Sequence, residues 1–306
     1  MSIRYDDKVA IVTGAGQGLG RSHAIELAKR GAKVVVNDLG GAKDGTGGSS
    51  EAALSVVAEV EALGGEAIAN GANVAKYDEV EAMVQQAMDK WGRVDILVNN
   101  AGILRDKSFV KGSLEDFQLV LDVHLMGTIN CTKACWEIMR EQAYGRVVVT
   151  TSSSGLYGNF GQTNYGSAKM GVIGAMNTLV QEGAKYNIRV NALAPTAGTR
   201  MTEGLIPDEA FALLTPETVT PAVLYLVSED APNKTIICAG AGAYSVAKIV
   251  ETDGAWLSPE EQTPEGIAAN WDAISSPEGE RQPEGGFEQT VKFTGKAMEG
   301  LGLAEK

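Results

Sequence analysis

A strand, a glycine-rich turn, a helix and a second strand follow one another near the start of the chain, and this pattern constrains the fold most. An apolar run at 8–13 predicts a buried strand and leads into four alternating glycines, Gly14, Gly16, Gly18 and Gly20. Glycines allow a tight turn, and the N–H groups at the start of the next helix favour a bound phosphate. The pattern predicts a dinucleotide-binding fold, with cofactor contacts from Gly14, Gln17, Gly18, Leu19 and Gly20.

The second strand, at 33–37, is followed by an acid that bears on the choice of cofactor. Asp38 stands 18 residues after Gly20, close to the spacing of a carboxylate that binds an adenosine ribose. Such a carboxylate repels the 2′-phosphate of NADP, so we expect NAD as the cofactor. The competing interpretation of Asp38 is a capping acid at a strand end.

Apolar runs alternate with amphipathic stretches along the chain, as a doubly wound fold requires. Strands are expected at 8–13, 33–37, 66–70, 94–98, 146–151 and 187–193. Helices are expected at 20–30, 50–63, 77–91, 114–142, 163–185 and 216–228. We therefore expect an α/β chain with a single doubly wound (Rossmann) parallel sheet of about seven strands, helices on both faces and a C-terminal extension. The carboxyl ends of the strands would meet at one edge, where ligands bind.

Three side chains within one short segment predict the chemistry. Tyr165 and Lys169 are four residues apart and share a helix face, and Ser152 follows the predicted strand at 146–151. A lysine ammonium beside the phenol would bring the tyrosine pKa down from about 10 toward the working range. Ser152 and Tyr165 could then hold one substrate oxygen and move a proton on or off an alcohol. The spacing alone is a weak signal, because a surface lysine beside a half-buried tyrosine has the same pattern.

Composition argues against several other classes of protein. With 306 residues, of which 44% are hydrophobic, the chain can bury one large core. A net charge of −13 argues against nucleic acid or an anionic membrane as a partner. Neither a membrane-spanning apolar run nor a signal core is evident, so we expect a cytoplasmic protein. Three cysteines and two histidines form no metal-ligand set, and no metal is expected.

Five motifs in order make the chain resemble the short-chain dehydrogenase/reductase superfamily over about residues 7–202. They are Thr13-Gly14-x-x-x-Gly18-x-Gly20, Asn99-Asn100-Ala101-Gly102, Ser152, Tyr165-x-x-x-Lys169 and Pro195-Thr196-Ala197-Gly198. The resemblance implies a path for adenosine and nicotinamide ribose along Asn100, Ala101 and Gly102, with Asn73 and Val74 beside the adenine. It implies that the nicotinamide carboxamide is covered by Pro195, Ala197 and Thr199. It also implies that Tyr165 and Lys169 contact the cofactor.

One position departs from the family pattern. The family usually places an asparagine on the helix that contains Leu121 to Gly127, where it helps to hold the catalytic lysine through a water. This chain has His124 at that position. A neutral imidazole donates one hydrogen bond and accepts another, so the resemblance places His124 among the catalytic residues, in a relay to Lys169. The alternative is a core histidine with a satisfied ring.

A narrower similarity, over about residues 5–260, is to the (3R)-hydroxyacyl-CoA dehydrogenase unit of the peroxisomal multifunctional enzyme type 2 family. It rests on the stretches 37–41, 101–106, 123–125, 154–162 and 194–202. It implies NAD-dependent oxidation of a (3R)-hydroxyacyl-CoA, with Tyr165 as the base and with Ser152 and Tyr165 at the substrate. Bacterial relatives described as 17β-hydroxysteroid dehydrogenases make a steroid the alternative substrate. A non-catalytic NAD-binding sensor is a remote alternative, and a homodimer or homotetramer is expected.

An acidic extension, 258–306, follows the expected dehydrogenase domain at 1–257, whose last strands are expected at 235–240 and 244–250. The extension has ten acids against four bases, a net charge of −6. A helix is expected from about Thr263 to Ile274. The extension could be a lid over the substrate pocket or a dimer arm, and the alternative is a loosely packed tail.

Coenzyme A is itself anionic, so an acyl-CoA substrate would need local cations in this acidic chain. Arg105, Lys107 and Arg200 lie near the expected carboxyl edge of the sheet and are candidate phosphate ligands. Ordinary solvated surface charge is the competing interpretation of all three.

Overall fold

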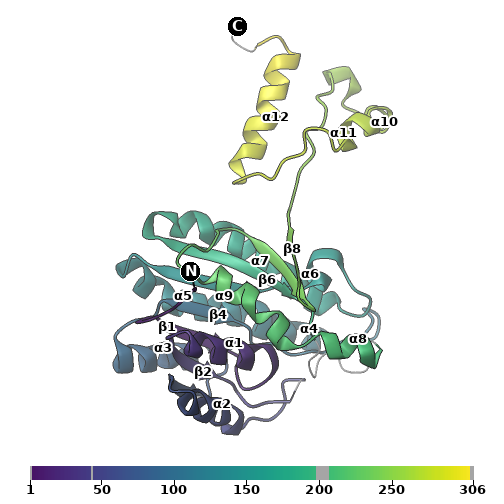
Figure 1. The fold of residues 1–306 in the computed structure, drawn as a ribbon. Coiled ribbons are helices and arrows are strands. Elements are labelled where there is room, and N and C mark those ends of the chain that lie inside the picture. The colour runs from purple at the N-terminus through teal and green to yellow at the C-terminus, as the bar shows by residue number, and fades with distance from the viewer. Residues whose placement is uncertain (1, 43, 198–206, 304–306) are drawn as a thin grey trace. The chain divides into compact units, whose positions relative to one another are not determined.

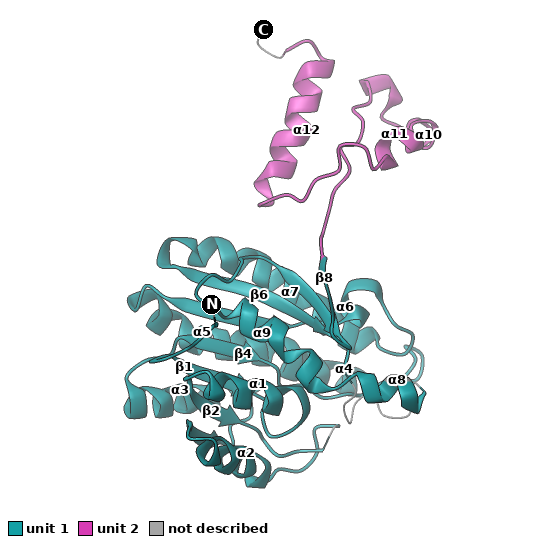
Figure 2. Cartoon of the chain, viewed as in Figure 1, with its two compact units in different colours: residues 1–246 teal, residues 247–306 magenta. Residues whose placement is uncertain are grey.

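The computed structural model describes the chain except at residues 1, 43, 198–206 and 304–306. It consists of two compact units, Met1–Val246 and Ala247–Lys306 (Figure 2). The larger unit contains the parallel sheet and its covering helices. The smaller unit contains the last three helices.

A sheet of eight strands organises the larger unit, in the order β3-β2-β1-β4-β5-β6-β7-β8 (Figure 1). β1 to β7 are paired in parallel. The strand order reverses between β1 and β4, which opens a crevice at the carboxyl edge of the sheet. The predicted doubly wound sheet is confirmed. The strands are β1 (Val9–Thr13), β2 (Lys33–Asn37), β3 (Glu66–Asn70), β4 (Ile96–Asn99), β5 (Gly145–Thr150), β6 (Ile188–Pro195), β7 (Ile236–Gly240) and β8 (Ala243–Ala247).

Helices cover both faces of the sheet (Figure 1). On one face α2 (Glu51–Ala62) and α9 (Thr220–Leu226) both pack against α1 (Gly18–Lys29). On the other, α3 (Tyr77–Trp91) and α7 (Thr163–Gly183) both pack against α5 (Gly127–Glu141). The spacing of apolar residues explains these faces, since α3 buries Val80, Met83, Val84 and Ala87 at helical intervals. Shorter helices are α4 (Leu114–Leu121), α6 (Ser153–Tyr157) and α8 (Asp208–Leu213).

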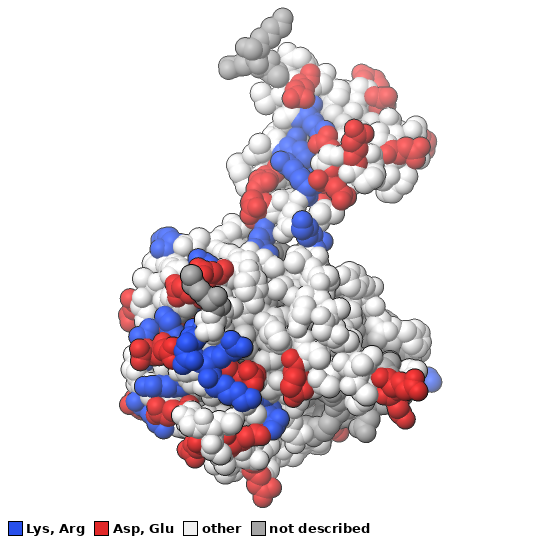
Figure 3. Space-filling model, viewed as in Figure 1, with Lys and Arg blue, Asp and Glu red and all other residues white. Residues whose placement is uncertain are grey.

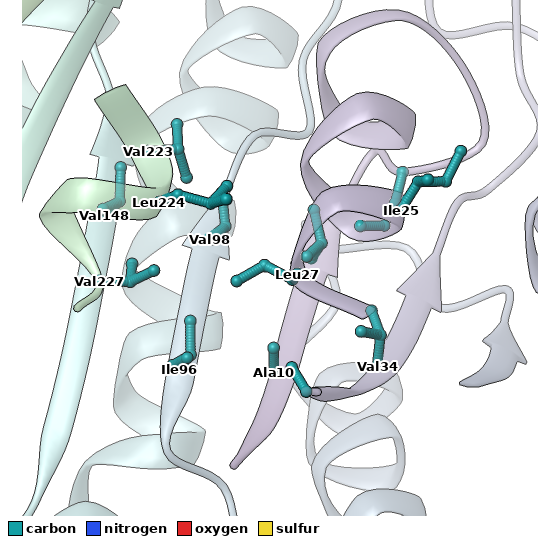
Figure 4. Close-up of a cluster of buried hydrophobic side chains, with 14 of the residues drawn as sticks. Ala10, Ile25, Leu27, Val34, Ile96, Val98, Val148, Val223, Leu224 and Val227 are labelled. Carbon is teal, nitrogen blue, oxygen red and sulfur yellow. The ribbon is translucent and has the colours of Figure 1, made fainter. Parts of the chain in front are cut away.

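The core on the α1 face is made mostly of branched aliphatic side chains. It joins side chains of the central strands to others from α1 and α9 (Figure 4), among them Leu27, Val34, Ile96, Val98, Val148, Val223, Leu224 and Val227. Burial of each such side chain stabilises the fold by roughly 1.5–3 kcal/mol. All five residues of β1 are buried, which explains why the first strand appears in the sequence as a continuous apolar run.

The helix expected at 114–142 contains a π-helical turn. α4 ends at Leu121, the π-helical turn spans Asp122–Met126, and α5 begins at Gly127 without a break in the helix. Such turns add a residue to the helical repeat and are frequent at functional sites. The predicted helix is present to Glu141, but its π-helical turn was not predicted.

The C-terminal edge of the sheet is a hairpin. Ala241 and Gly242 connect β7 to β8 with positive φ values of 50° and 76°, as a type I′ turn requires. β8 is therefore antiparallel to β7, and it ends at Ala247 rather than at residue 250. The helix expected at 216–228 shortens to α9, which follows a 3₁₀ turn at Pro216–Thr218.

The smaller unit is held together by polar pairs. Glu251 and Arg281 exchange backbone hydrogen bonds of 2.9 and 3.0 Å, and the Glu251 carboxylate also binds Lys292 and Gln289 of α12 (Phe287–Gly300). Lys296 of the same helix pairs with Asp253 at 2.7 Å. Figure 3 shows basic side chains of this unit gathered beside acidic ones. The single helix expected at 263–274 is divided into α10 (Pro264–Ala269) and α11 (Trp271–Ser275).

Two kinds of feature are missing from the part of the chain that the structure describes. It has no helix that combines the length and the apolar character needed to cross a membrane. It also has no group of three or more His, Cys, Asp or Glu side chains that could hold a metal ion.

Candidate active site

The crevice at the strand reversal contains a cavity of about 300 Å³, and it brings most of the predicted site residues together. Predicted residues that line it are Gly14, Gln17, Gly18, Leu19, Asp38, Asn73, Val74, Asn100, Ala101, Gly102, His124, Tyr165, Lys169 and Pro195. Gly20, Ala197 and Ser152 do not line this cavity, and Thr199 lies outside the described residues. The glycine turn and the tyrosine–lysine pair therefore open on one space.

The glycine turn leaves the start of α1 open to a ligand. Gln17 is the N-cap residue of α1 and makes no side-chain cap, so the first N–H groups of the helix have no side-chain cap partner. These groups and the helix dipole suit a pyrophosphate. Gly20 has a packing role instead, because a Cβ there would lie 2.3 Å from the Gly14 carbonyl oxygen.

Asp38 is held rigidly at the end of β2. Its Oδ2 accepts a hydrogen bond from Gly16 N–H at 2.8 Å, and its Oδ1 accepts one from Gly40 N–H at 2.6 Å. A second cavity of about 480 Å³ adjoins the carboxylate and is also lined by Glu51. Two acids thus border the space beside the expected adenosine ribose.

The three predicted chemical groups come from the end of β5 and from α7. Ser152 is the N-cap of α6, and its Oγ accepts the N–H of Ser154 at 3.2 Å. Tyr165 and Lys169 lie one turn apart on α7, with the Lys169 Nζ 5.5 Å from the centroid of the tyrosine ring. Nζ donates a hydrogen bond of 2.6 Å to the Thr150 carbonyl, and burial lowers the Lys169 pKa to about 7.

The pKa of Tyr165 differs from the expected direction. Burial raises it, and a hydrogen bond with Ser152 opposes that rise. The expectation that Lys169 lowers the Tyr165 pKa was wrong, because spacing in the sequence predicts that the two side chains are close but not that they are buried. Desolvation disfavours the charge on both side chains.

His124 lies in the π-helical turn and is buried beneath the tyrosine. The two rings meet edge to face, with centroids 5.0 Å apart and planes at 90°. Nε2 lies 3.0 Å from the Ile103 nitrogen and 2.7 Å from the Ile103 oxygen. Burial and the nearby Lys169 charge hold the His124 pKa well below its usual value, so the imidazole is neutral.

Buried polar atoms without partners lie beside this group. Within the described part of the chain, His124 Nδ1, Thr150 Oγ1 and Asn99 Oδ1 are buried and have no hydrogen-bond partner. His124 makes no direct hydrogen bond to Lys169 among the bonds of the described residues. A relay between them would therefore need a bridging water, for which His124 Nδ1 offers a free acceptor or donor.

Asn164, which supports the tyrosine, and Gln162, which lies near it, were not identified from the sequence. Asn164 Oδ1 accepts the Tyr165 N–H at 2.8 Å, and its Nδ2 donates to the Arg105 carbonyl at 3.1 Å. Gln162 connects Ser154 Oγ, at 2.6 Å, with Asp106, at 2.7 Å. Their place immediately before Tyr165 was the available signal.

The candidate phosphate ligands are largely engaged elsewhere. Arg105 and Lys107 both pair with Asp116, at 3.0 and 3.5 Å. Arg200 lies outside the described residues. The two described cations are therefore partly neutralised by a carboxylate.

Comparison with known proteins agrees with this geometry. A family model described as short chain dehydrogenase matches residues 8–210. The chain belongs to the short-chain dehydrogenase family. Members of the family are oxidoreductases that bind NAD or NADP, and the expected enzyme class is confirmed.

The relatives include a protein of similar length and longer proteins. A short-chain type dehydrogenase/reductase of Mycobacterium tuberculosis is 51% identical over 270 residues, which are 88% of this chain and 94% of that protein. The solved full-length peroxisomal multifunctional enzyme type 2 of Drosophila melanogaster aligns with a TM-score of 0.81 and 39% identity. The alignment covers 98% of this chain but only 51% of that protein, so this chain corresponds to about half of it.

A third solved structure carries a bound dinucleotide. It is a 7α-hydroxysteroid dehydrogenase complexed with NADH and 7-oxo glycochenodeoxycholic acid, with a TM-score of 0.71 and 30% identity. The alignment covers 78% of this chain and 95% of that protein.

Replacement of Ser152 by alanine should raise the Tyr165 pKa further, because the Ser152 hydrogen bond lowers it. Alcohol oxidation needs the phenolate, so the ascending limb of kcat/KM against pH should move to higher pH, and kcat at neutral pH should fall by about 10²-fold. Ser153→Ala, at the exposed neighbouring position, is the control and should leave the profile unchanged. If the ascending limb of the Ser152→Ala profile stays at the wild-type pH, the hydrogen bond between Ser152 and Tyr165 is contradicted.

Proposed function

We propose that this chain oxidises a (3R)-hydroxyacyl-CoA to the 3-ketoacyl-CoA, with NAD as the hydride acceptor. The observation that carries the proposal is the convergence of Tyr165 and Lys169 with the glycine turn on one cavity. The likeness to peroxisomal multifunctional enzyme type 2 supports the substrate class. A nicotinamide bound in the cavity would supply the hydride chemistry.

Each side chain of the site has its own role in the proposed reaction. Tyr165, as phenolate, takes the hydroxyl proton of the substrate, and Ser152 holds the same oxygen as it becomes a carbonyl. Lys169, with a pKa of about 7, carries a positive charge on part of the molecules at neutral pH and favours the phenolate when charged. The edge-on contact with the neutral His124 ring keeps the phenol in place, and we propose that a water joins His124 Nδ1 to Lys169.

The choice of NAD over NADP is supported by the acids at the end of β2. Asp38 is fixed by two backbone N–H groups and cannot turn away from a 2′-phosphate without losing both bonds. Glu51 adds a second negative charge beside the same cavity. A phosphate there would face repulsion from both groups.

A steroid alcohol is the second candidate substrate. The solved 7α-hydroxysteroid dehydrogenase, with its bound oxo-steroid, favours it. Both substrates would undergo the same hydride chemistry, so the catalytic residues do not separate them. The presence of Ser152, Tyr165 and Lys169 together argues against a non-catalytic sensor.

An NADH-formation assay separates these substrates. We expect turnover of (3R)-hydroxyacyl-CoA, with the (3S) isomer and a 17β-hydroxysteroid each slower by about 10²-fold or more in kcat/KM. NADP⁺ in place of NAD⁺ should lower kcat/KM at least about tenfold. Preference for the (3S) isomer or for the steroid would contradict the substrate, and equal use of NADP⁺ would contradict the role of Asp38.

We also propose that the smaller unit is an arm that joins two copies of this chain. No described residue at 247–303 is buried. Phe287, Val291 and Met298 of α12 are 77%, 54% and 46% exposed and lie along one face of the helix. A stripe of large apolar side chains on a helix with no buried residue favours a partner surface. The family resemblance makes a second copy the expected partner.

Val291→Asp places a charge in this stripe and should convert the assembly to monomer. Multi-angle light scattering at equal protein concentration measures the change. Glu299→Lys, an exposed charge change elsewhere on the same helix, should leave the mass unchanged. A wild-type monomer, or a variant that retains the wild-type assembly, would contradict the arm.

A further inference from the structure

A loop at 39–48, which the structure describes except at residue 43, contributes to the wall of the cofactor cavity. Of its residues, Leu39, Gly41, Ala42 and Gly45 line the cavity, as do residues 100–103, which follow β4. The loop is closed at its base by a bond of 3.0 Å from the Ser49 N–H to the Leu39 carbonyl. At its far end the Asp44 carboxylate binds Thr46 N–H at 3.0 Å and Thr46 Oγ1 at 2.7 Å.

Arg105 connects this loop to the start of α4. Its Nε donates a hydrogen bond of 2.7 Å to the Asp44 carbonyl, and its NH1 donates one of 3.0 Å to Asp116 Oδ1. The planar guanidinium can satisfy both acceptors at once, which a lysine ammonium does less well. Arg105 and Asp116 side chains are only 27% and 17% exposed, so water screens the pair weakly.

The acceptor on the far side is itself fixed. Asp116 lies in the first turn of α4, where the Ser113 Oγ accepts its N–H at 3.1 Å. Lys107 pairs with the same carboxylate at 3.5 Å but has no hydrogen bond to the 39–48 loop among the described residues. Arg105 and Lys107 thus share a partner and differ in their reach to the loop.

The backbone around Arg105 leads directly to the catalytic groups. The Arg105 carbonyl accepts from Asn164, whose Oδ1 holds the Tyr165 N–H. Two residues earlier, the Ile103 backbone is bonded to the His124 ring. Ile103 also packs against the loop, since a Cβ on Gly45 would lie 3.2 Å from its Cγ2.

We infer that Arg105 is a positioning residue that holds the 39–48 loop against the segment after β4, beside the cofactor cavity, and couples the position of the loop to the placement of Tyr165. The inference deepens the proposed function, on which it rests for the nature of the ligand. With the Arg105 bonds in place, the same segment fixes the cavity wall through Asp44 and the catalytic tyrosine through Asn164. Loss of these bonds therefore affects both dinucleotide binding and turnover.

The test compares Arg105→Met with Lys107→Met in the full chain. Hydrogen exchange of the cofactor-free protein measures how often the loop opens. Arg105→Met should speed exchange of the Gly45, Thr46 and Ser49 amides about tenfold. The NADH Kd should rise about tenfold, as expected for loss of charge-assisted hydrogen bonds. In the proposed oxidation kcat should fall as well, and Arg105→Lys should recover part of each loss. Lys107→Met should match wild type in loop exchange and in NADH Kd.

Three results would overturn this role of Arg105. If Arg105→Met keeps the wild-type exchange rates and the wild-type NADH Kd, Arg105 does not hold the loop. If Lys107→Met has the same effects as Arg105→Met, the effects come from loss of positive charge near Asp116. A raised Kd with wild-type kcat would remove the coupling to Tyr165. Failure of the proposed substrate is distinguishable, because exchange and NADH binding do not depend on it.

Discussion

Hydrogen bonds between Thr13 and the Asn100–Ala101 segment hold the carboxyl ends of β1 and β4 together, and the site depends on them. Thr13 Oγ1 accepts the N–H groups of Asn100 at 3.0 Å and Ala101 at 3.1 Å. Asn100 Nδ2 donates in turn to the Thr13 and Gly14 carbonyls, each at 3.0 Å. Since the strand order reverses here, these bonds fix the crevice into which both halves of the site open. Gly14 packs closely against the Asn100–Ala101 segment, and only glycine suits this position. Its φ is +62°, and a Cβ there would lie 2.8 Å from the Ala101 Cα.

Burial then determines the chemistry of the groups around the crevice. Desolvation raises the pKa of Tyr165, lowers that of Lys169 to about 7 and keeps His124 neutral. Burial thus favours the uncharged form of all three side chains, and a charge bound beside Tyr165 would shift its ionisation.

The sequence predicted the strands and most cavity residues because buried parallel strands are continuous apolar runs whose polar ends meet at one edge. Tyr165 and Lys169 were predicted from their spacing on one helix face, and Ser152 from its place after a strand. The π-helical turn around His124 was not predicted, because apolar spacing indicates a helix but not the register of its backbone hydrogen bonds. The Tyr165 pKa shift and the contacts of Arg105 and Asn164 depend on burial and on the path of loops, neither of which is encoded in short spacings.

The central claim is that Tyr165 is the base of an NAD-dependent alcohol oxidation, and Tyr165→Phe tests it most directly. The substitution keeps the ring that meets His124 and removes only the hydroxyl. NADH titration and the oxidation assay on the same preparation give the answer. We expect wild-type NADH affinity with kcat lowered by at least about 10³-fold. Substantial turnover in the phenylalanine variant would contradict it.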